Sequence, residues 1–291
     1  MKYLNTKVSS IYNAMYVFAI KIYLLFCYFV IKRKIPLSKE KADVIVSLTS
    51  YHKRFKSLKW TLESLMQQKT QYQYRLILIL SQEDIKKYGK LPGYLSNFQK
   101  RGLELLIVEE NLKSYKKAFY TYEMGAPLVT ADDDIYYPLY WLQKIMEESV
   151  KTPNIILAYR GHYILNENNK ILPYVEWMKW SEKNFYKEER YSFLPTGTSG
   201  VYYPIDSLKG LKESKENFLH ICPHADDFWF KYLTVCNAFK ARRISEKNIH
   251  FPIMNKGESL FEVNVGEGLN DIQFEKIFLK DLAFFRKIIE E

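Results

Sequence analysis

Cysteine is scarce in this sequence, and the spacing of the cysteines predicts neither a disulfide framework nor a metal site. Cys27, Cys222 and Cys236 are the only three in 291 residues, and no two of them form a CxxC pair. An odd number also cannot pair completely. A disulfide scaffold and a cysteine zinc site are therefore excluded, and a reducing compartment is the simpler expectation.

The chain also lacks internal repeats and low-complexity tracts. Hydrophobic residues make up 47% and charged residues 26%, the balance of a globular protein with a sizeable core rather than of a disordered chain, a fibre or a multi-span transporter. Aromatic residues reach 16%, with 24 tyrosines, which fits a strand-rich fold whose surface suits flat or polar ligands. The length allows one large domain or two small ones.

Acidic residues are almost missing from the start of the chain, and this explains its net charge. Residues 1–41 hold eight lysines and arginines against Glu40 alone, so they carry +7 of the formal +10. The remaining residues share only +3. A basic groove across the folded body is not expected, so we expect no nucleic-acid partner.

The apolar stretch 11–31 is about as long as a membrane-spanning helix. Lys21 stands at its centre, where a charge costs roughly 2.5–3.5 kcal/mol on insertion. Three alternatives stay open: a single transmembrane anchor, a helix lying in the membrane interface, and a helix packed on the folded domain. A cleaved signal peptide is disfavoured because basic residues 32–34, not a small-residue cleavage site, follow the stretch.

That basic cluster decides the expected location. It outweighs Lys2 and Lys7 if the stretch spans the bilayer, and it attracts anionic headgroups if the stretch lies on the surface. Either arrangement leaves the body at the cytoplasmic face of the membrane. We therefore divide the chain into a membrane-associating segment with a basic linker, 1–41, and a folded domain, 42–291.

Short apolar runs alternate with helical patterns through the body. Continuous β-branched and leucine runs predict buried strands, and apolar residues at helical spacing predict helices. Strands are expected at 43–48, 75–81, 103–108, 128–131 and 154–159, and helices at 55–68, 139–150, from the acidic pair at 226 onward, and at 274–289. The alternation predicts an α/β sandwich with a mostly parallel sheet, whose ligands bind at the carboxyl ends of the strands.

Asp132, Asp133 and Asp134 directly follow one of these strands. Three adjacent carboxylates repel one another unless a cation is present, and oxygen ligands suit Mg²⁺ or Mn²⁺ rather than zinc. The alternative is a solvated acidic turn that caps the next helix. The position between a strand end and a helix favours a metal site.

The ordered segments VIVSLTSYHKR, RLILILS and VTADDDIYYP resemble bacterial glycosyltransferases of the GT-A fold, close to family 2, over residues 43–240. The resemblance implies a GT-A-type, Rossmann-like α/β/α sandwich that binds a nucleotide-sugar and a divalent metal through a DxD motif. It assigns Asp132 and Asp134 to that motif, with Asp134 the preferred metal ligand. Asp133 contacts the ribose in an alternative register.

Further donor contacts follow from the same resemblance. It places Thr49, Ser50 and Tyr51 at the nucleoside and ribose, and Arg54 near the diphosphate unless it is a solvated first-turn cation. After the third strand, a group of basic and aromatic residues is expected to meet diphosphate, base or sugar, with Lys113 as the solvated member; these are Tyr115, Lys116 and Lys117.

A second acidic pair, Asp226-Asp227, opens a predicted helix. The resemblance implies that its second member, Asp227, deprotonates the acceptor hydroxyl, with Asp226 as the alternative base. A positioned carboxylate suits that proton transfer. The competing interpretation is an N-cap pair that complements the helix dipole.

Smaller signals complete the set. Gly197 and Gly200 allow backbone to approach a ligand closely, or form a plain turn. Trp177 and Trp180 are candidates for an acceptor platform, although single tryptophans more often pack in the core or at a hinge. His250 is a candidate for an additional metal ligand. A zinc helix built on histidines 220 and 224 is disfavoured because a proline at 223 interrupts it.

We expect, from these signals together, an inverting transfer of a sugar from a UDP-sugar to a glycan or lipid-linked hydroxyl, in surface polysaccharide or lipopolysaccharide synthesis. A sugar-phosphate nucleotidyltransferase is the enzymatic alternative, but the first strand is followed by LTSYHKR, without the glycine-rich loop that cradles a triphosphate. A catalytically inactive membrane-bound scaffold is the alternative from another class.

Overall fold

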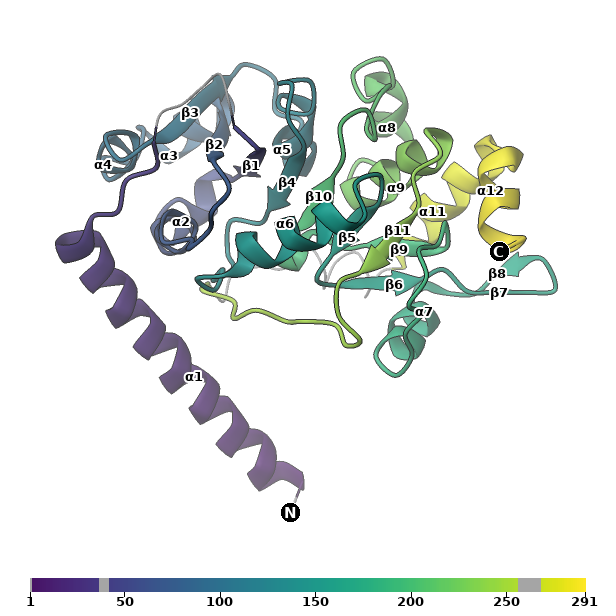
Figure 1. Cartoon of the computed structure of the whole chain (residues 1–291), viewed down its shortest axis with the longest axis horizontal. Helices are drawn as coiled ribbons and strands as arrows, with labels where there is room; N and C mark the ends of the chain where they lie inside the picture. Colours follow the sequence, from purple (N-terminus) through teal and green to yellow (C-terminus); the bar gives the residue numbers. More distant parts are fainter. Residues whose placement is uncertain (1, 37–41, 256–267) are drawn as a thin grey trace.

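Runs of valine, isoleucine and leucine form a central seven-stranded sheet in the computed structural model, which describes residues 2–36, 42–255 and 268–291 (Figure 1). The strand order is β11-β5-β10-β4-β1-β2-β3, and β10 runs antiparallel to both of its neighbours. This confirms the mostly parallel sheet. The strands are β1 (Val44–Thr49), β2 (Tyr74–Ser81), β3 (Leu103–Val108), β4 (Leu128–Ala131), β5 (Ile156–Ala158), β10 (Val201–Tyr203) and β11 (Ala241–Arg243).

Strand register brings the carboxyl ends of three parallel strands to one edge. Leu48 of β1 pairs with Ala131 of β4, and Thr49 pairs with Ile79 of β2. The residues that follow these strands must therefore lie close together, although they are far apart in the sequence.

Two layers of helices cover the sheet because successive strand side chains point to opposite faces. Val44, Val46 and Leu48 pack in one core with apolar residues of α2 and α6, whereas Ile45 packs in the other core with residues of α5, α8, α9, α11 and α12. The helices of the body are α2 (Leu58–Met66), α3 (Gln82–Tyr88), α4 (Leu95–Gln99), α5 (Lys116–Phe119), α6 (Trp141–Lys151), α7 (Tyr174–Ser181), α8 (Lys215–Ile221), α9 (Asp226–Cys236), α11 (Leu269–Lys280) and α12 (Leu282–Ile289).

Two small antiparallel sheets lie outside the central one. β6 (Gly161–Tyr163) pairs with β9 (Phe193–Pro195), and β7 (Asn166–Glu167) pairs with β8 (Lys170–Ile171). The β6–β9 pair leads directly into the turn that carries Gly197.

Two details of the predicted elements are wrong. β3 is the edge strand of the sheet and is half-exposed, with Ile107 47% exposed, so its apolar sequence does not mean burial on both faces. The predicted C-terminal helix 274–289 is two helices. Asp281 separates them, because its side chain accepts hydrogen bonds from the N–H groups of Ala283 and Phe284 and so begins α12.

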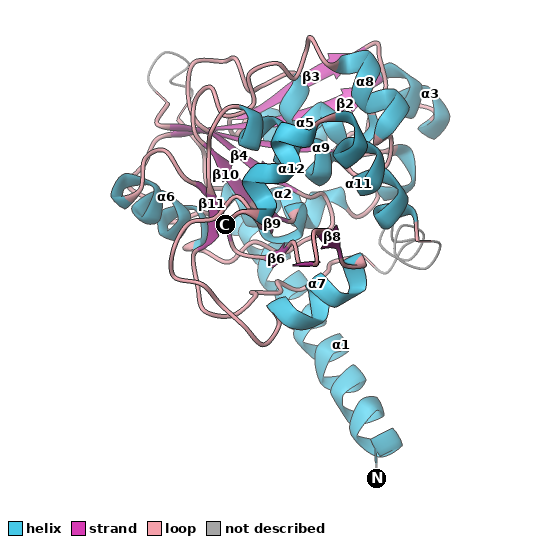
Figure 2. Ribbon diagram, turned by 90° about the vertical axis from the view of Figure 1, so that its right-hand side faces the viewer, coloured by secondary structure: helices cyan, strands magenta, loops and turns pink. Residues whose placement is uncertain are grey.

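Helix α1 (Lys2–Phe26) extends away from the body, and its C-terminal half packs on it (Figures 1 and 2). Ile20 and Leu24 pack against Met254, with Trp60 and Tyr136 beside them. A π-helical turn, Cys27–Ile31, links α1 to the chain that enters the sheet.

Candidate active site

The three aspartates after β4 lie at the sheet edge predicted for them, and a network from the end of β1 holds the middle one. Ser50 Oγ donates to Asp133 Oδ2 at 2.5 Å, and Arg54 Nη1 donates to Asp133 Oδ1 at 2.6 Å. The hydroxyl of Thr61 on α2 donates to the Asp133 carbonyl at 3.0 Å. Each carboxylate oxygen of Asp133 thereby accepts one hydrogen bond, and the two bonds hold Ser50 and Arg54 in place.

Asp134 and Asp132 flank this anchored residue and keep free carboxylate oxygens. Arg54 Nη1 lies 3.0 Å from Asp134 Oδ2, and Lys117 Nζ lies 3.1 Å from Asp132 Oδ1. The second oxygen of each receives no hydrogen bond from another described residue. Burial and the neighbouring Asp133 carboxylate raise the pKa of Asp134 to about 7. Carboxylate oxygens are the ligands that hard cations prefer. Among the described residues, however, no three His, Cys, Asp or Glu side chains are gathered closely enough to hold a metal ion by themselves.

The second acidic pair reaches the same place from the first turn of α9. Lys117 Nζ lies 3.1 Å from Asp226 Oδ2 as well as from Asp132, so one buried ammonium bridges the two acidic groups. Burial disfavours the charge of Lys117, but the carboxylates of Asp132, Asp226 and Asp227 outweigh it and hold its pKa well above the ordinary value. Because Asp132 and Asp226 are far apart in the sequence, no local pattern predicts that they lie close together.

Asp227 is held by backbone rather than by a cation. Its Oδ2 accepts a hydrogen bond from Gly197 N–H at 3.1 Å, and its Oδ1 receives none from the described residues. Burial and the adjacent Asp226 raise its pKa to about 7. A carboxylate with one fixed oxygen, one free oxygen and a pKa near neutrality is suited to take a proton.

Gly197 fits between the charged groups because it has no side chain. A Cβ there would lie 3.0 Å from Lys117 Nζ, 3.3 Å from Asp227 Oδ1 and 3.5 Å from Asp132 Oδ1. Gly200 is required for packing instead, because its φ is +98° and a Cβ there would lie 2.5 Å from the Trp141 ring.

Thr49, Tyr51 and His250 are placed less centrally. Thr49 Oγ1 donates to the carbonyl of Ile79, and the Tyr51 ring lies 5.6 Å from the guanidinium of Arg54. His250 is 56% exposed, and its Nε2 lies 3.5 Å from Glu182. None of the described contacts of His250 involves the three aspartates.

Two aromatic candidates, Tyr115 and Trp177, belong to the core, which corrects the expectation of a ligand contact for Tyr115 and agrees with the packing alternative for Trp177. Tyr115 is fully buried, stacks on Phe218 with centroids 4.0 Å apart, and donates its hydroxyl to the carbonyl of Cys222. Trp177 is 1% exposed, and Trp180 stacks on Tyr186. Aromatic rings at these positions stabilise the packing of the body.

A second polar cluster at the end of β2 was missed by the sequence analysis. Asp84 Oδ1 lies 2.9 Å from His52 Nδ1, and Asp84 Oδ2 accepts from Ser81 Oγ at 2.6 Å and from Lys116 Nζ at 3.4 Å. Burial opposes ionisation of Asp84, but these hydrogen bonds and the Lys116 charge outweigh it and lower its pKa. Lys116 and Lys117 are adjacent in sequence but form ion pairs with different carboxylates, Lys116 with Asp84 and Lys117 with Asp132 and Asp226.

A signal for this cluster was present in the sequence. Ser81 and Asp84 have the spacing of a helix cap, and the Ser81 side chain does accept from Asp84 N–H at 3.2 Å. Asp84 also follows a buried strand, as Asp132 does. The same strand-end argument therefore applies to both.

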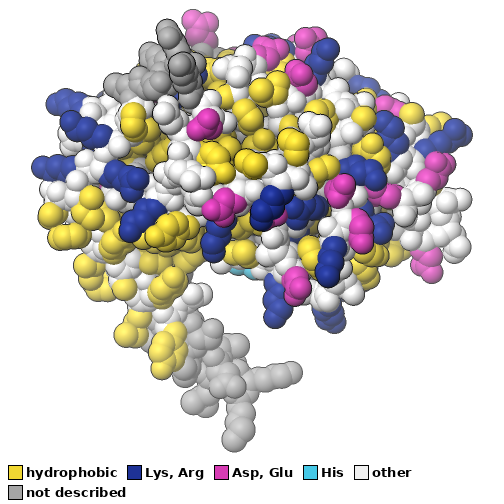
Figure 3. Space-filling view, in the orientation of Figure 1, with side chains coloured by type: hydrophobic (Ala, Val, Ile, Leu, Met, Phe, Trp, Pro, Cys, Tyr) yellow, Lys and Arg dark blue, Asp and Glu magenta, His cyan; other side chains and the backbone are white. Residues whose placement is uncertain are grey.

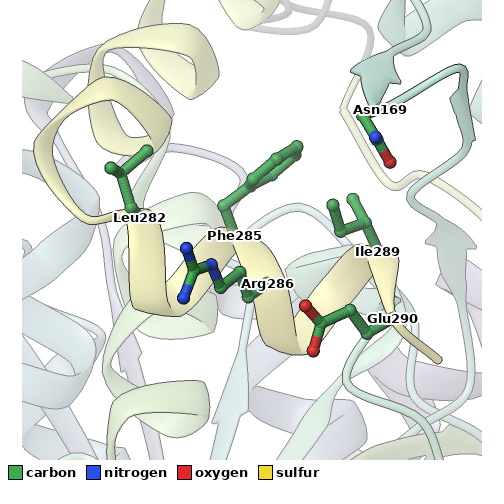
Figure 4. A pocket seen from close by; sticks show the side chains of 6 residues that line it. All are labelled: Asn169, Leu282, Phe285, Arg286, Ile289 and Glu290. Atoms are coloured by element: carbon green, nitrogen blue, oxygen red, sulfur yellow. The ribbon is translucent and has the colours of Figure 1, made fainter.

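A separate pocket of about 390 Å³ lies on α12 (Figure 4). Apolar and charged side chains of α12 line it together with a turn residue; they are Leu282, Phe285, Arg286, Ile289, Glu290 and Asn169. It contains none of the aspartates described above.

Comparison with known proteins finds similarity at the level of structure. No protein-family model and no curated protein sequence matches the chain. The mannosyltransferase PcManGT from Pyrobaculum calidifontis, in complex with GDP-Man and Mn²⁺, is similar at 12% identity over 91% of this chain and 76% of that one, with a TM-score of 0.52.

S. aureus TarS 1-349, in complex with UDP, matches at 14% identity over 72% of this chain, with a TM-score of 0.45. The match covers 59% of that TarS chain. The likeness to PcManGT, together with the seven-stranded mostly parallel sheet, confirms the predicted fold class: this chain has the fold of a glycosyltransferase.

Proposed function

We propose that this protein is a metal-dependent glycosyltransferase that moves a sugar from a nucleoside diphosphate donor to an acceptor hydroxyl. One observation carries the proposal. Five carboxylates, from the 132–134 run and the 226–227 pair, converge on two cations, Arg54 and Lys117. Two cations do not balance five ionised carboxylates, and in their present surroundings Asp134 and Asp227 have pKa values of about 7. A divalent cation would let all five carboxylates ionise, and a diphosphate would then complete the charge balance.

The carboxylates fit a divalent metal. Mg²⁺ and Mn²⁺ take oxygen ligands, and Mg²⁺ is typically held by one or two carboxylates together with substrate phosphates. Asp134 and Asp132, with their free oxygens, are the residues that would hold such an ion. When bound, the metal would neutralise charge that develops on the leaving diphosphate.

A positively charged side chain of the protein is also proposed to bind the donor diphosphate. Arg54 is anchored by Asp133 and is therefore positioned to bind diphosphate oxygens without searching many side-chain conformations. Thr49, Ser50 and Tyr51 are proposed to contact the nucleoside, with the Asp84 and His52 pair one strand further along the same edge.

Asp227 is proposed as the base. The acceptor oxygen bonds to the anomeric carbon, the bond from that carbon to the diphosphate oxygen breaks, and the acceptor proton passes to Asp227 Oδ1. The single displacement inverts the anomeric centre. Lys117, which bridges Asp132 and Asp226, ties the acid pair to the donor side.

The proposal extends to the biological setting. The N-terminal segment supports a location at the cytoplasmic face of a membrane and an acceptor on a growing glycan or lipid carrier, in surface polysaccharide or lipopolysaccharide synthesis. The alternatives are a nucleotidyltransferase and an inactive scaffold. The free oxygen and near-neutral pKa of Asp227 favour an enzyme over the scaffold.

Nucleotide binding tests the reaction class first. Thermal unfolding of the full chain would be followed with UDP or GDP, each with and without Mn²⁺. A ligand at about 100 times its dissociation constant stabilises the native state by about 2.7 kcal/mol. We expect a metal-dependent stabilisation by one of the two nucleotides.

Asp134→Asn should abolish that stabilisation. The matched control is Asp43→Asn, which changes a carboxylate at the opposite edge of the sheet, where it accepts from Gln73 N–H. Loss in Asp134→Asn with retention in Asp43→Asn supports the donor site. Equal stabilisation of both variants would place the bound nucleotide away from Asp134, and no response to any nucleotide would favour the scaffold.

A further inference from the structure

We infer that α1 lies in the surface of an anionic bilayer and is fixed rigidly to the body, instead of crossing the membrane. The inference concerns an interaction surface and does not depend on the reaction proposed above. It rests on which side chains of α1 the body covers, and on where the positive charge lies.

The two faces of α1 are both apolar but have different surroundings. At 100° per residue, Ile20, Leu24 and Cys27 fall on one face, and these are the buried residues between Tyr12 and Ile31, the part whose side chains the structure describes. The opposite face carries large side chains that are 39–65% exposed: Met15, Phe18, Ile22, Leu25, Phe26 and Phe29. An apolar face of this kind needs a partner.

The covered face excludes a simple membrane span. Contacts with the body begin at Val17 and continue through Cys27, in the middle of the apolar stretch Tyr12–Ile31. The apolar stretch before Val17 is only five residues, about 7.5 Å of helix, whereas a bilayer core is about 30 Å thick. Placing Tyr12–Ile31 across the bilayer would drag Trp60, Tyr136 and their polar neighbours into hydrocarbon.

Lys21 fits an interfacial helix better than a span. It is half-buried, and its Nζ lies 5.8 Å from the centroid of the Trp60 ring, on the face of α1 that meets the body. A lysine on that face need not enter the lipid. The charge that counts against a span is thus accommodated by the docked helix.

Charge complementarity identifies the occupant of the uncovered face as an anionic lipid surface. Lys32, Arg33 and Lys34 directly follow the helix and are exposed or half-exposed. No acidic residue precedes Glu40 in the sequence. Figure 3 shows the hydrophobic side chains of α1 meeting the body beside a group of lysines and arginines. Apolar side chains next to basic ones are the pattern of a helix that binds anionic membranes.

The chain after α1 is built into the body, so the helix cannot swing freely. Arg101 forms a buried ion pair with Glu63, with Nη1 2.7 Å from Oε2, and its Nε donates to the carbonyl of Arg33. Ile35 N–H donates to the Arg101 carbonyl at 2.8 Å. At Gly102, a Cβ would lie 2.4 Å from the Ile35 carbonyl oxygen, so only glycine permits this approach.

The docked helix also touches the segment that carries the acidic run. Met254, which packs on Ile20 and Leu24, donates its N–H to the Asp134 carbonyl at 2.6 Å, and Tyr136 N–H donates to the Pro252 carbonyl at 2.9 Å. The bilayer surface and the aspartates are therefore held at a fixed distance and orientation, because these two hydrogen-bonded backbone segments connect them.

Vesicle flotation of the full chain tests the inference. We expect binding to phosphatidylcholine vesicles that contain phosphatidylglycerol, weak binding to phosphatidylcholine alone, and release by alkaline carbonate. Replacing Lys32, Arg33 and Lys34 together by glutamine should weaken binding on the order of a hundredfold. Phe18→Ser should weaken it about tenfold or more.

Leu279→Ser is the matched control, since Leu279 is 70% exposed on α11, at the other end of the molecule from α1 (Figure 1). Retention in the membrane after carbonate treatment would overturn the interfacial location in favour of a span. Equal effects of Phe18→Ser and Leu279→Ser, or self-association in place of vesicle binding, would overturn the lipid surface as occupant. Nucleotide stabilisation in the same variants keeps this result separate from a failure of the proposed reaction.

Discussion

The two acidic groups of the candidate site differ in how their carboxylates are held. Asp133 accepts from a hydroxyl and a guanidinium, so the run after β4 is fixed by side chains of the neighbouring strand end. Asp227 accepts a single backbone N–H, from Gly197, and shares its surroundings with the ammonium of Lys117. The comparison teaches that similar acidic motifs support different chemistry. In the proposed reaction, the first group would hold a charged ligand and the second would take a proton.

The largest effect should separate these roles. We expect Asp227→Asn to lower the turnover number by about 10²–10⁴, because an amide cannot take the acceptor proton, while nucleotide affinity stays near that of the wild type. Turnover and calorimetric titration with the nucleotide would be measured together. Asp134→Asn should instead weaken nucleotide binding. Loss of nucleotide binding in the Asp227 variant would show that both acidic groups contribute to the nucleotide site.

Lys117 joins the two groups, and its removal should cost stability. Lys117→Met leaves Asp132 and Asp226 facing each other without their shared cation, so unfolding in urea should show a loss of about 3–5 kcal/mol. Lys117→Arg retains the charge and serves as the control. Arg54→Met should lower the free energy of unfolding by less, because one of the carboxylates that it leaves unpaired, Asp134, is partly exposed to solvent. A Lys117→Met protein as stable as the wild type would show that the bridge is not formed.

The dependence of stability on pH should also distinguish the groups. The pKa of Asp227 is about 7 in the folded chain and 3.8 ordinarily, so the native state keeps a proton that the unfolded chain has lost. The stability contribution of this residue is therefore greatest at low pH and falls as the pH rises through 7.

Asp227→Asn removes this slope, so above neutral pH the variant should exceed the wild type by about 1 kcal/mol, or about 2 °C in Tm, while it remains inactive. Urea unfolding on both sides of neutrality checks this. An unchanged slope would assign the shifted proton to another carboxylate.

The smallest effect is expected at the glycine between the groups. Gly197→Ala places a methyl 3.0 Å from Lys117 Nζ and 3.3 Å from Asp227 Oδ1, close enough to displace both slightly. We expect a drop in turnover of about tenfold with a change in unfolding free energy of about 1 kcal/mol or less. Steady-state kinetics beside thermal unfolding would test this. Equal turnover in the variant would place the reacting atoms away from Gly197.

Sequence patterns predicted the first half of the fold closely. The limits of β3 and β4 agree with the predicted 103–108 and 128–131, because continuous apolar runs bounded by polar residues have few alternative structures. The placement of three aspartates after β4 then followed from the rule for strand ends. The helix that begins at Asp226 also agrees with its prediction.

Partners across long sequence distances were beyond those patterns. Asp84 joins His52 and Lys116 from separate elements, and local spacing predicts only its contact with Ser81, through the helix cap. The burial of Tyr115 was not predicted for the same reason, because composition alone does not tell a core ring from a ligand-binding ring.

The sequence by itself determined the class of fold, the edge of the sheet that carries the acidic run, and the apolar, basic character of the first 36 residues. Each of these follows from periodicity or local charge, which act between residues close in the chain. Tertiary structure alone decided that Lys117 bridges Asp132 and Asp226, that Lys116 turns to Asp84 instead, and that one face of α1 is covered. Those outcomes depend on strand register and helix packing, because these determine which buried charges and apolar faces meet.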